Sequence, residues 1–72
     1  MMTQHPNAVL RGGGSLVPDG ERIRHVSNTT DTFKLFLGNR YEHYAPTEDM
    51  YLHDDGQELQ VFEWVRRTFV AE

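Results

Sequence analysis

The chain has 72 residues, no cysteine, and a formal net charge of -4 from 11 acidic and 7 basic side chains. A chain of this length supports one small hydrophobic core, and disulfides are excluded as a source of stability. The acidic balance argues against nucleic acid, and the lack of a long apolar run or signal-like N-terminus argues against membrane insertion and export, so we expect one cytoplasmic domain over residues 1–72.

The first third of the chain predicts short elements joined by turns. Residues 1–6 show no pattern and are expected to form a flexible tail. A strand over 8–11 is followed by residues 12–15 (GGGS), which are typical of a flexible connection. Residues 18–20 (PDG) predict a turn, because proline fixes φ and glycine accepts positive φ. A further strand is predicted over 21–26, where β-branched side chains recur.

The middle of the chain predicts a loop followed by a β-hairpin. The polar cluster at 27–32 is expected to be the loop, because its side chains hydrogen-bond locally. Strands are predicted over 33–37 and 40–44. The Gly38-Asn39 pair between them is typical of a two-residue type II′ turn.

The register of this hairpin is less certain than its turn. Strict pairing places Phe36 favourably opposite Tyr41, but it sets Leu35 opposite Glu42. A bulge or a longer loop therefore remains an alternative. Residues 45–47 (APT) are expected to end the strand, because proline cannot donate to a ladder.

The clearest local signal is Asp55-Gly56, which favours a two-residue type I′ turn. Four pairs follow from the register that such a turn imposes: Leu52 with Leu59, Met50 with Val61, His53 with Glu58, and Tyr51 with Gln60. The members of the first two pairs are assigned to the core. By the same alternation, Tyr51, Phe62 and Trp64 are expected on the opposite face of the sheet.

The segment 59–70 has two interpretations. As a strand, it turns at Arg66-Arg67 and places Trp64 opposite Phe69. As a helix, its apolar residues recur at three- and four-residue spacing. We favour the strand, because Val, Phe, Trp and Thr all favour β-structure. The expected fold class is mainly β, a small antiparallel meander or partly open barrel of about five strands, with a helical C-terminal segment as the alternative.

Metal binding and catalysis have few candidate residues. The possible ligands are His25, His43, His53, Glu42, Asp54 and Asp55. Their spacing matches no H-x-x-x-H or H-E-x-x-H motif, so solvated or salt-bridged histidines are favoured over a metal site. No serine lies in a nucleophile elbow, and cysteine chemistry is excluded. We therefore predict no metal, no cofactor and no catalytic residue.

Aromatic and arginine side chains form the predicted binding surface. A sheet this small cannot cover both of its faces, and aromatic side chains near arginines suit a partner or a ligand. The candidate site residues are Tyr41, Tyr44, Tyr51, Trp64, Arg66 and Arg67. Core packing of the aromatic side chains is the alternative. For the Arg66-Arg67 pair, the alternative is solvation of a turn or strand end.

Four stretches of the sequence carry a family resemblance: residues 7–13 (NAVLRGG), 21–26 (ERIRHV), 38–43 (GNRYEH) and 61–68 (VFEWVRRT). Together they span nearly the whole chain. They resemble a family of short, functionally uncharacterised actinobacterial proteins, often encoded among genes for antibiotic and other specialised-metabolite biosynthesis. The resemblance implies a cytoplasmic accessory setting, and it carries over no catalytic or binding residue.

Three functions follow from these observations. The first is a noncatalytic accessory protein that binds a biosynthetic enzyme or itself, as a homodimer, through its aromatic sheet face. The second is a binder of a small aromatic or polyketide-like ligand, such as a pathway product or intermediate. The third is a small cyclase or isomerase with His25 or His43 as general base. We favour the first, because the core is thin and aromatic side chains are in surplus.

Overall fold

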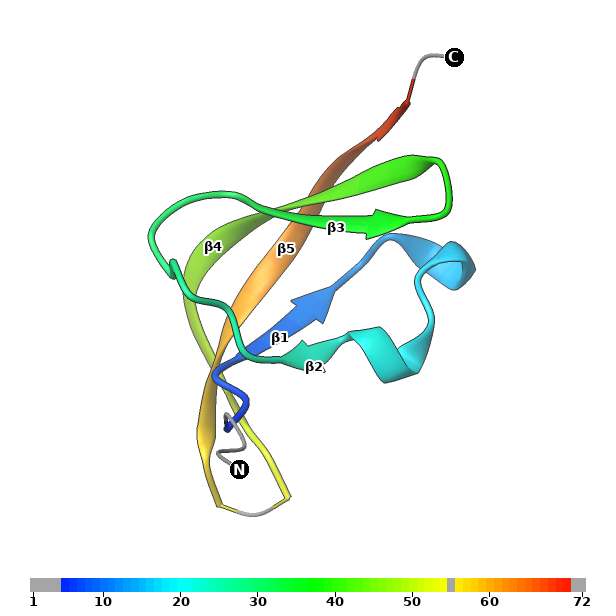
Figure 1. Cartoon of the computed structure of the whole chain (residues 1–72). Helices are drawn as coiled ribbons and strands as arrows, with labels where there is room; N and C mark the ends of the chain where they lie inside the picture. Colours follow the sequence, from blue (N-terminus) through cyan, green and yellow to red (C-terminus); the bar gives the residue numbers. More distant parts are fainter. Residues whose placement is uncertain (1–4, 55, 71–72) are drawn as a thin grey trace, which may run out of the picture.

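The computed structural model describes residues 5–54 and 56–70, and its ordered elements are strands and two short 3₁₀ turns (Figure 1). These are β1 (Ala8–Arg11), η1 (Gly14–Leu16), η2 (Asp19–Glu21), β2 (Ile23–Arg24), β3 (Phe33–Leu37), β4 (Arg40–Leu52) and β5 (Glu58–Phe69). The C-terminal segment is thus a strand, which confirms the favoured interpretation. The described residues include no helix with the length and hydrophobicity that a membrane crossing requires.

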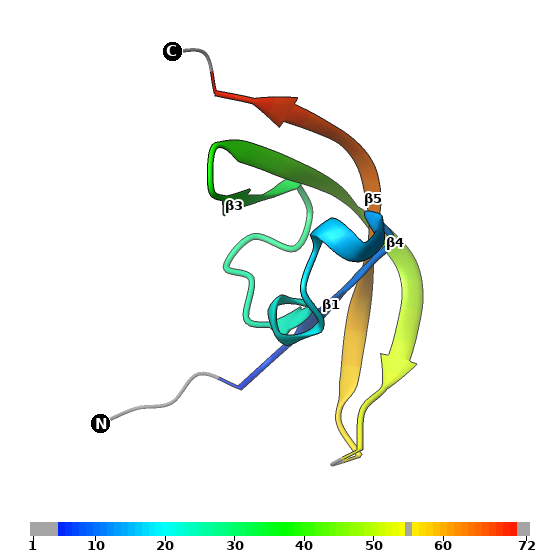
Figure 2. The same ribbon diagram turned by 90° about the vertical axis from the view of Figure 1, so that its right-hand side faces the viewer.

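The strands form one open, mixed sheet in the order β2-β1-β5-β4-β3. The expected antiparallel meander is present as β3, β4 and β5, and the mainly β class with about five strands is confirmed. β1 joins this meander by pairing in parallel with β5, and β2 pairs antiparallel with β1. Figure 2 shows the long β4–β5 hairpin curving around the rest of the chain, which lies on its concave side.

The β3–β4 hairpin has the register that strict pairing predicts. Gly38 has a φ of 63°, as the first central position of a type II′ turn requires. Phe36 pairs with Tyr41, and their ring centroids lie 4.9 Å apart. Leu35 pairs with Glu42 without a bulge, because both side chains are buried on the inner face of the sheet.

The predicted strand end at residues 45–47 is wrong, because β4 continues through Pro46 to Leu52. Between Pro46, opposite Phe62, and Met50, opposite Gln60, β4 contains two more residues than β5. Within this irregularity the Thr47 hydroxyl donates to the Val61 carbonyl at 2.7 Å. β3 pairs only with residues 40–44, so Pro46 lies where β4 has become an edge strand and its missing N–H breaks no ladder.

The register predicted for the second hairpin is wrong by one residue. The backbone N–H of His53 donates to the Gln57 carbonyl at 2.8 Å, and that of Gly56 donates to the His53 carbonyl at 2.9 Å. Three residues, 54–56, therefore connect the paired positions 53 and 57, where the type I′ prediction had two. Gly56 has a φ of 85°, as a three-residue connection of this kind needs at its last position. Asp55 lies outside the described residues.

This shift changes which side chains are buried. Met50 and Leu52, assigned to the core from the sequence, are 54% and 67% exposed, because they pair with Gln60 and Glu58. Tyr51 pairs with Leu59 in place of Gln60. Leu59 and Val61 are buried as predicted.

The predicted turn at Arg66-Arg67 is absent, because β5 runs unbroken to Phe69, which pairs with Arg40. Trp64 pairs with Tyr44, while His43 pairs with Arg66, so Val65 is an extra residue on β5. This bulge reverses the alternation of side chains along the strand. It places Trp64 and Arg67 on the same inner face.

The main core lies on the inner face of the sheet. Its buried members are Ala8, Leu10, Val17, Val26, Leu35, Tyr44 and Phe62, with Phe33, Leu37 and Trp64 packed against them. Phe62 and Trp64 were expected on the face opposite the core. The main core instead contains Phe62 and packs against Trp64, so it lies on the face that the sequence analysis had placed outside. The predicted strand over 21–26 shortens to β2, and beyond it the Asn7 side chain bonds both the N–H and the carbonyl of Val26.

Candidate functional site

A fully buried carboxylate, that of Glu42, lies at the centre of the inner face on β4. One of its oxygens accepts hydrogen bonds from Arg67 Nε at 2.7 Å and from Arg40 Nε at 2.8 Å. The other accepts from Trp64 Nε1 at 2.9 Å. The guanidinium of Arg67 also lies 5.6 Å from the centroid of the Trp64 ring. Four side chains from two strands thus form one buried polar cluster, the Glu42 cluster.

The donors around Glu42 determine its charge. Burial alone would raise the pKa of this carboxyl group, but the hydrogen bonds from Arg67, Trp64 and Arg40 outweigh burial and hold the pKa below its usual 4.5. Glu42 is therefore ionised at neutral pH, and its single negative charge is shared by two arginines. Glu42 lies on β4, and two of its three donors, Trp64 and Arg67, lie on β5. The cluster therefore joins the two strands.

The same cluster anchors the glycine-rich segment 12–17, of which the sequence predicts residues 12–15 to form a flexible connection. Arg67 donates to the Gly13 carbonyl at 2.9 Å, and Arg40 donates to the Leu16 carbonyl at 2.7 Å. The Tyr44 hydroxyl donates to the Gly12 carbonyl at 2.9 Å. The segment is therefore fixed, and the expectation of a flexible connection is wrong.

Arg22 holds this segment from its other side. Its guanidinium donates to four backbone carbonyls at 2.8 to 3.3 Å, those of Leu10, Gly12, Gly14 and Val17. The fork of N–H donors on arginine can serve several acceptors at once, which the single ammonium of lysine cannot do in this geometry. Backbone carbonyls in the connection between β1 and η2 thus accept hydrogen bonds from side chains, where a strand would receive them from a neighbouring strand.

The six predicted site residues lie in three separate places. Tyr44, Trp64 and Arg67 meet at the Glu42 cluster, where Tyr44 is fully buried. Tyr41 and Arg66 lie on the outer face of the sheet, and Tyr51 is 45% exposed near the tip of the β4–β5 hairpin. The structure therefore brings three of the six together, as part of the core.

Sequence analysis missed the roles of Glu42, Arg40 and Arg22. The alternation along residues 40–44 could have placed Glu42 beside Tyr44 on one face, but it held no sign that three donors would reach that carboxylate. No local pattern marks Arg22, whose acceptors belong to loop backbone. These contacts depend on the tertiary fold.

The outer face of β3, β4 and β5 carries a row of basic side chains. Lys34, His43 and Arg66 are directly paired across the three strands. Lys34 and Arg66 are exposed, and neither forms an ion pair with any residue in the described ranges. Glu63, further along the same face, is paired with Arg11 of β1 at 3.5 Å. Positive charge on this part of the face is therefore uncompensated.

An aromatic row lies beside the basic one. Phe36 and Tyr41 are 54% and 37% exposed, and Tyr41 pairs with Thr68 on β5. The Tyr41 ring lies 6.5 Å from the imidazole of His43. We call the exposed side chains of the two rows, Lys34, Phe36, Tyr41 and Arg66, the cationic face.

His43 is almost fully buried between these rows, and its Nε2 lies 2.8 Å from the Thr68 hydroxyl. Burial lowers its pKa below the usual 6.5, and the charges of Arg66 and Lys34 lower it further, against a small opposing effect of Glu42. The imidazole is therefore neutral at neutral pH. It therefore adds no positive charge beside Lys34 and Arg66.

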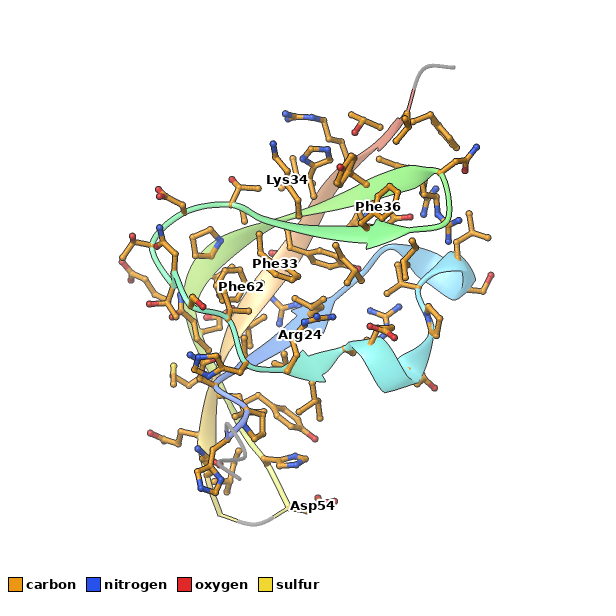
Figure 3. All side chains as sticks on the ribbon, viewed as in Figure 1. Arg24, Phe33, Lys34, Phe36, Asp54 and Phe62 are labelled. Atoms are coloured by element: carbon orange, nitrogen blue, oxygen red, sulfur yellow. The ribbon has the colours of Figure 1, made fainter. Side chains whose placement is uncertain are left out.

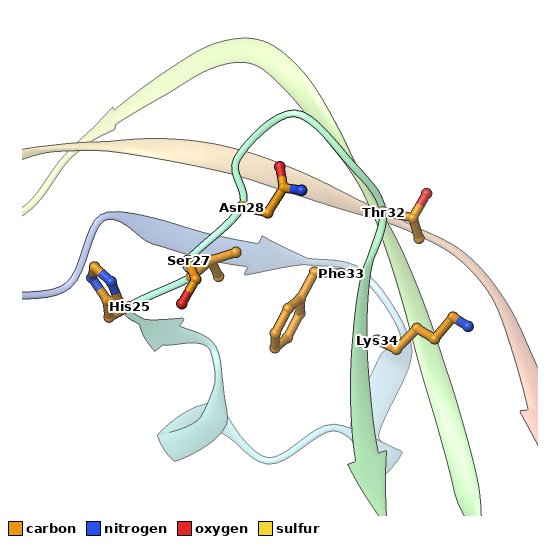
Figure 4. Close-up of a pocket in the computed structure, with 7 residues that line it drawn as sticks. His25, Ser27, Asn28, Thr32, Phe33 and Lys34 are labelled. Atoms are coloured by element: carbon orange, nitrogen blue, oxygen red, sulfur yellow. The ribbon is translucent and has the colours of Figure 1, made fainter.

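A shallow pocket of about 400 Å³ lies between the end of β2 and the start of β3 (Figure 4). It is lined by His25, Val26, Ser27, Asn28, Thr32, Phe33 and Lys34. None of the six predicted site residues lines it. Across residues 5–54 and 56–70, no three histidine, aspartate or glutamate side chains gather where they could hold a metal ion.

Fold and site together define a class: a small protein built on an open, mixed β-sheet with a buried ion-pair cluster between two of its strands. The chain belongs to a family of unknown function, DUF5988, which it matches over residues 2–72. No curated protein and no solved structure matches the chain.

Proposed function

We propose that this protein is a noncatalytic interaction protein that binds a protein partner, or a second copy of itself, through the cationic face. The observation that carries the proposal is an exposed aromatic pair, Phe36 and Tyr41, beside two cations that have no ion-pair partner among residues 5–54 and 56–70. Lys34 and Arg66 lie on either side of the neutral His43 and repel each other weakly across it, and exposed aromatic side chains leave apolar surface in water. A partner with apolar and acidic side chains relieves both costs.

The polar groups of the interior support a noncatalytic role. Both oxygens of Glu42 accept hydrogen bonds from the chain itself, and the Nε2 of His43 is engaged by Thr68. A general acid or base needs a free position within hydrogen-bond reach of a substrate. These two buried groups serve the fold.

The setting that we propose is the cytoplasm, beside a biosynthetic enzyme of specialised metabolism. The four stretches that resemble a family encoded among such genes support this setting. In that setting the cationic face binds an acidic patch on the enzyme.

The test compares two charge reversals of equal size. Arg66→Glu alters the cationic face, whereas Arg11→Glu alters an exposed arginine of β1 whose partners, Asp49 and Glu63, lie at 3.4 and 3.5 Å. Calorimetric titration against the enzymes encoded beside the gene measures the dissociation constant. We expect Arg66→Glu to raise it about tenfold or more and Arg11→Glu to change it less than about twofold.

Equal weakening by the two variants would contradict the assignment of the cationic face. An unchanged dissociation constant for Arg66→Glu would contradict it as well. Both variants are first compared with the wild type by circular dichroism, so that unfolding is not mistaken for lost binding.

A further inference from the structure

The distal part of the β4–β5 hairpin, residues 48–60, is strongly acidic, and we call it the arm. Its sequence contains five acidic residues and no lysine or arginine: Glu48, Asp49, Asp54, Asp55 and Glu58. The remainder of the chain therefore has one more basic than acidic residue, since 7 basic residues stand against 11 − 5 = 6 acidic ones. The net negative charge of the sequence thus comes from residues 48–60.

The arm also exposes apolar side chains and a free strand edge. Met50, Tyr51 and Leu52 are consecutive and 54%, 45% and 67% exposed. β3 pairs only with residues 40–44, so the edge of β4 at these positions has no sheet partner among the described residues. An exposed apolar edge strand is a ready surface for association.

The arm and the cationic face complement each other in two respects. One is acidic and the other basic, and both carry exposed apolar side chains within their charged surroundings. Figure 3 shows Lys34 and Phe36 on β3 far from Asp54 at the tip of the arm, so one molecule cannot place its own arm on its own face. A second copy supplies the arm without this constraint.

We propose that the arm of one copy docks on the cationic face of a second copy, and that the contact is reciprocal in a homodimer. The proposal rests on the proposed function, because it names the occupant of the same face. A two-fold axis lets both arms and both faces be used at once, which closes the assembly at two chains. Met50 and Leu52 then cover Phe36 and Tyr41, and arm carboxylates approach Lys34 and Arg66.

The test exchanges charge between the two surfaces. In the face variant, Lys34→Glu is combined with Arg66→Glu. In the arm variant, Glu48→Lys, Asp54→Lys and Glu58→Lys are combined, which changes the net charge of the arm from −5 to +1. Either variant alone presents surfaces of like charge, so we expect each to be monomeric. Mixed in equal amounts, they present complementary surfaces at both contacts, so we expect a heterodimer.

Sedimentation equilibrium at low salt gives the masses. We expect wild type and the mixture to approach twice the 8.4 kDa of the chain, and each variant alone to remain near that mass. Rising salt should weaken the wild-type dimer, because exposed charges are screened. Asp19→Lys, a charge reversal at an exposed position of η2 outside both surfaces, is the control and should dimerise as the wild type does.

Two results would overturn the proposal: a wild-type chain that is monomeric at millimolar concentration, or a face variant that dimerises as well as the wild type. The proposed function fails separately. A monomeric wild type whose binding to an enzyme is weakened by Arg66→Glu would refute the dimer and leave the cationic face as a docking site. Circular dichroism and Trp64 fluorescence confirm that each variant is folded before its mass is measured.

Discussion

Glu42 is the buried residue that links β4 to β5 through its side chain. Its carboxylate bonds Arg40 of its own strand and Trp64 and Arg67 of β5. The two arginines in turn bond carbonyls of the glycine-rich segment. A buried charge of this kind contributes little net stability relative to an apolar replacement, but removing one partner leaves the other charges unpaired. Its role is therefore to fix one arrangement of the strands.

Glu42→Gln should destabilise the protein by about 3 kcal/mol, because the amide keeps the shape of the side chain but leaves Arg40 and Arg67 without a counter-charge. Such a loss is comparable to the whole stability of about 3 to 5 kcal/mol available to a domain this small. Urea unfolding followed by Trp64 fluorescence measures it. Glu63→Gln, on an exposed side chain, is the control and should change stability by less than about 0.5 kcal/mol. Equal losses of stability in the two variants would show that the Glu42 cluster contributes no more to stability than an exposed ion pair does.

The stability of the fold should fall in two stages as the pH is lowered. The pKa of His43 in the fold is below 6.5, so the unfolded chain takes up this proton first and stability decreases as pH drops through the folded value. Glu42, whose folded pKa is below 4.5, gives a second decrease at lower pH by the same argument. Urea titrations from about pH 7 to about pH 3 follow both stages.

His43→Gln separates the two stages, because glutamine can bond Thr68 but does not titrate. In this variant the decrease below pH 6.5 should be smaller, and the one below pH 4.5 should remain. An unaltered profile would mean that His43 does not cause the first stage.

At the scale of elements, local turn chemistry predicts connections well and their exact lengths poorly. Gly38-Asn39 gives both the turn and the register of the β3–β4 hairpin. The Asp55-Gly56 pair suits either a two-residue turn or the end of a three-residue connection, and the sequence does not distinguish them. One added residue moves the side chains of β4 to the opposite face relative to β5, so Met50 and Leu52 do not share the face of the buried Leu59 and Val61.

The glycine-rich segment depends on the absence of a side chain at one position. A Cβ on Gly13 would lie 2.8 Å from the Tyr44 hydroxyl and 2.9 Å from a methyl of Val17, whereas a Cβ on Gly14 would meet nothing within 4 Å. Both glycines have positive φ, 95° and 73°, so alanine is strained at either.

Gly14→Ala should therefore cost only the backbone strain, about 1 to 3 kcal/mol. Gly13→Ala should cost about 1 to 3 kcal/mol more, because it also crowds the core. Urea unfolding of the pair measures this difference directly. Equal losses would indicate that the segment moves aside at Gly13 and is less firmly held than its hydrogen bonds imply.

For the whole molecule, the class of fold could be predicted from the sequence, but the order of the strands could not. Period-two patterning and turn residues identify most of the strands. The parallel pairing of residues 8–11 with 60–63 leaves no local signal, because the two segments are remote in the chain and neither turn nor alternation relates them. The Glu42 cluster leaves no local signal either. It depends on the bulge at Val65 and on loop carbonyls that only the tertiary fold brings within reach.

Because β1 is an inner strand, a single change in its four residues should affect the entire protein. Leu10→Ala removes a side chain that is 1% exposed and should cost about 2 to 5 kcal/mol, enough to unfold much of the population. Leu52→Ala, on a side chain that is 67% exposed, should cost less than about 0.5 kcal/mol. Both are measured by urea unfolding at low protein concentration. Similar losses at the two positions would argue against the observed register of the arm.

The pairing of the first strand with the last also affects how the chain folds as it is synthesised. At about 5 to 20 residues per second, the roughly 50 residues between β1 and its partner take about 3 to 10 s to be translated. During that interval β1 has only the two residues of β2 to pair with, and the edge that later pairs with β5 is open. β1 has only four residues and ends in Arg11 and three glycines, a composition that resists pairing with other nascent chains. The short length of β1 therefore limits its pairing with other nascent chains until β5 has been synthesised.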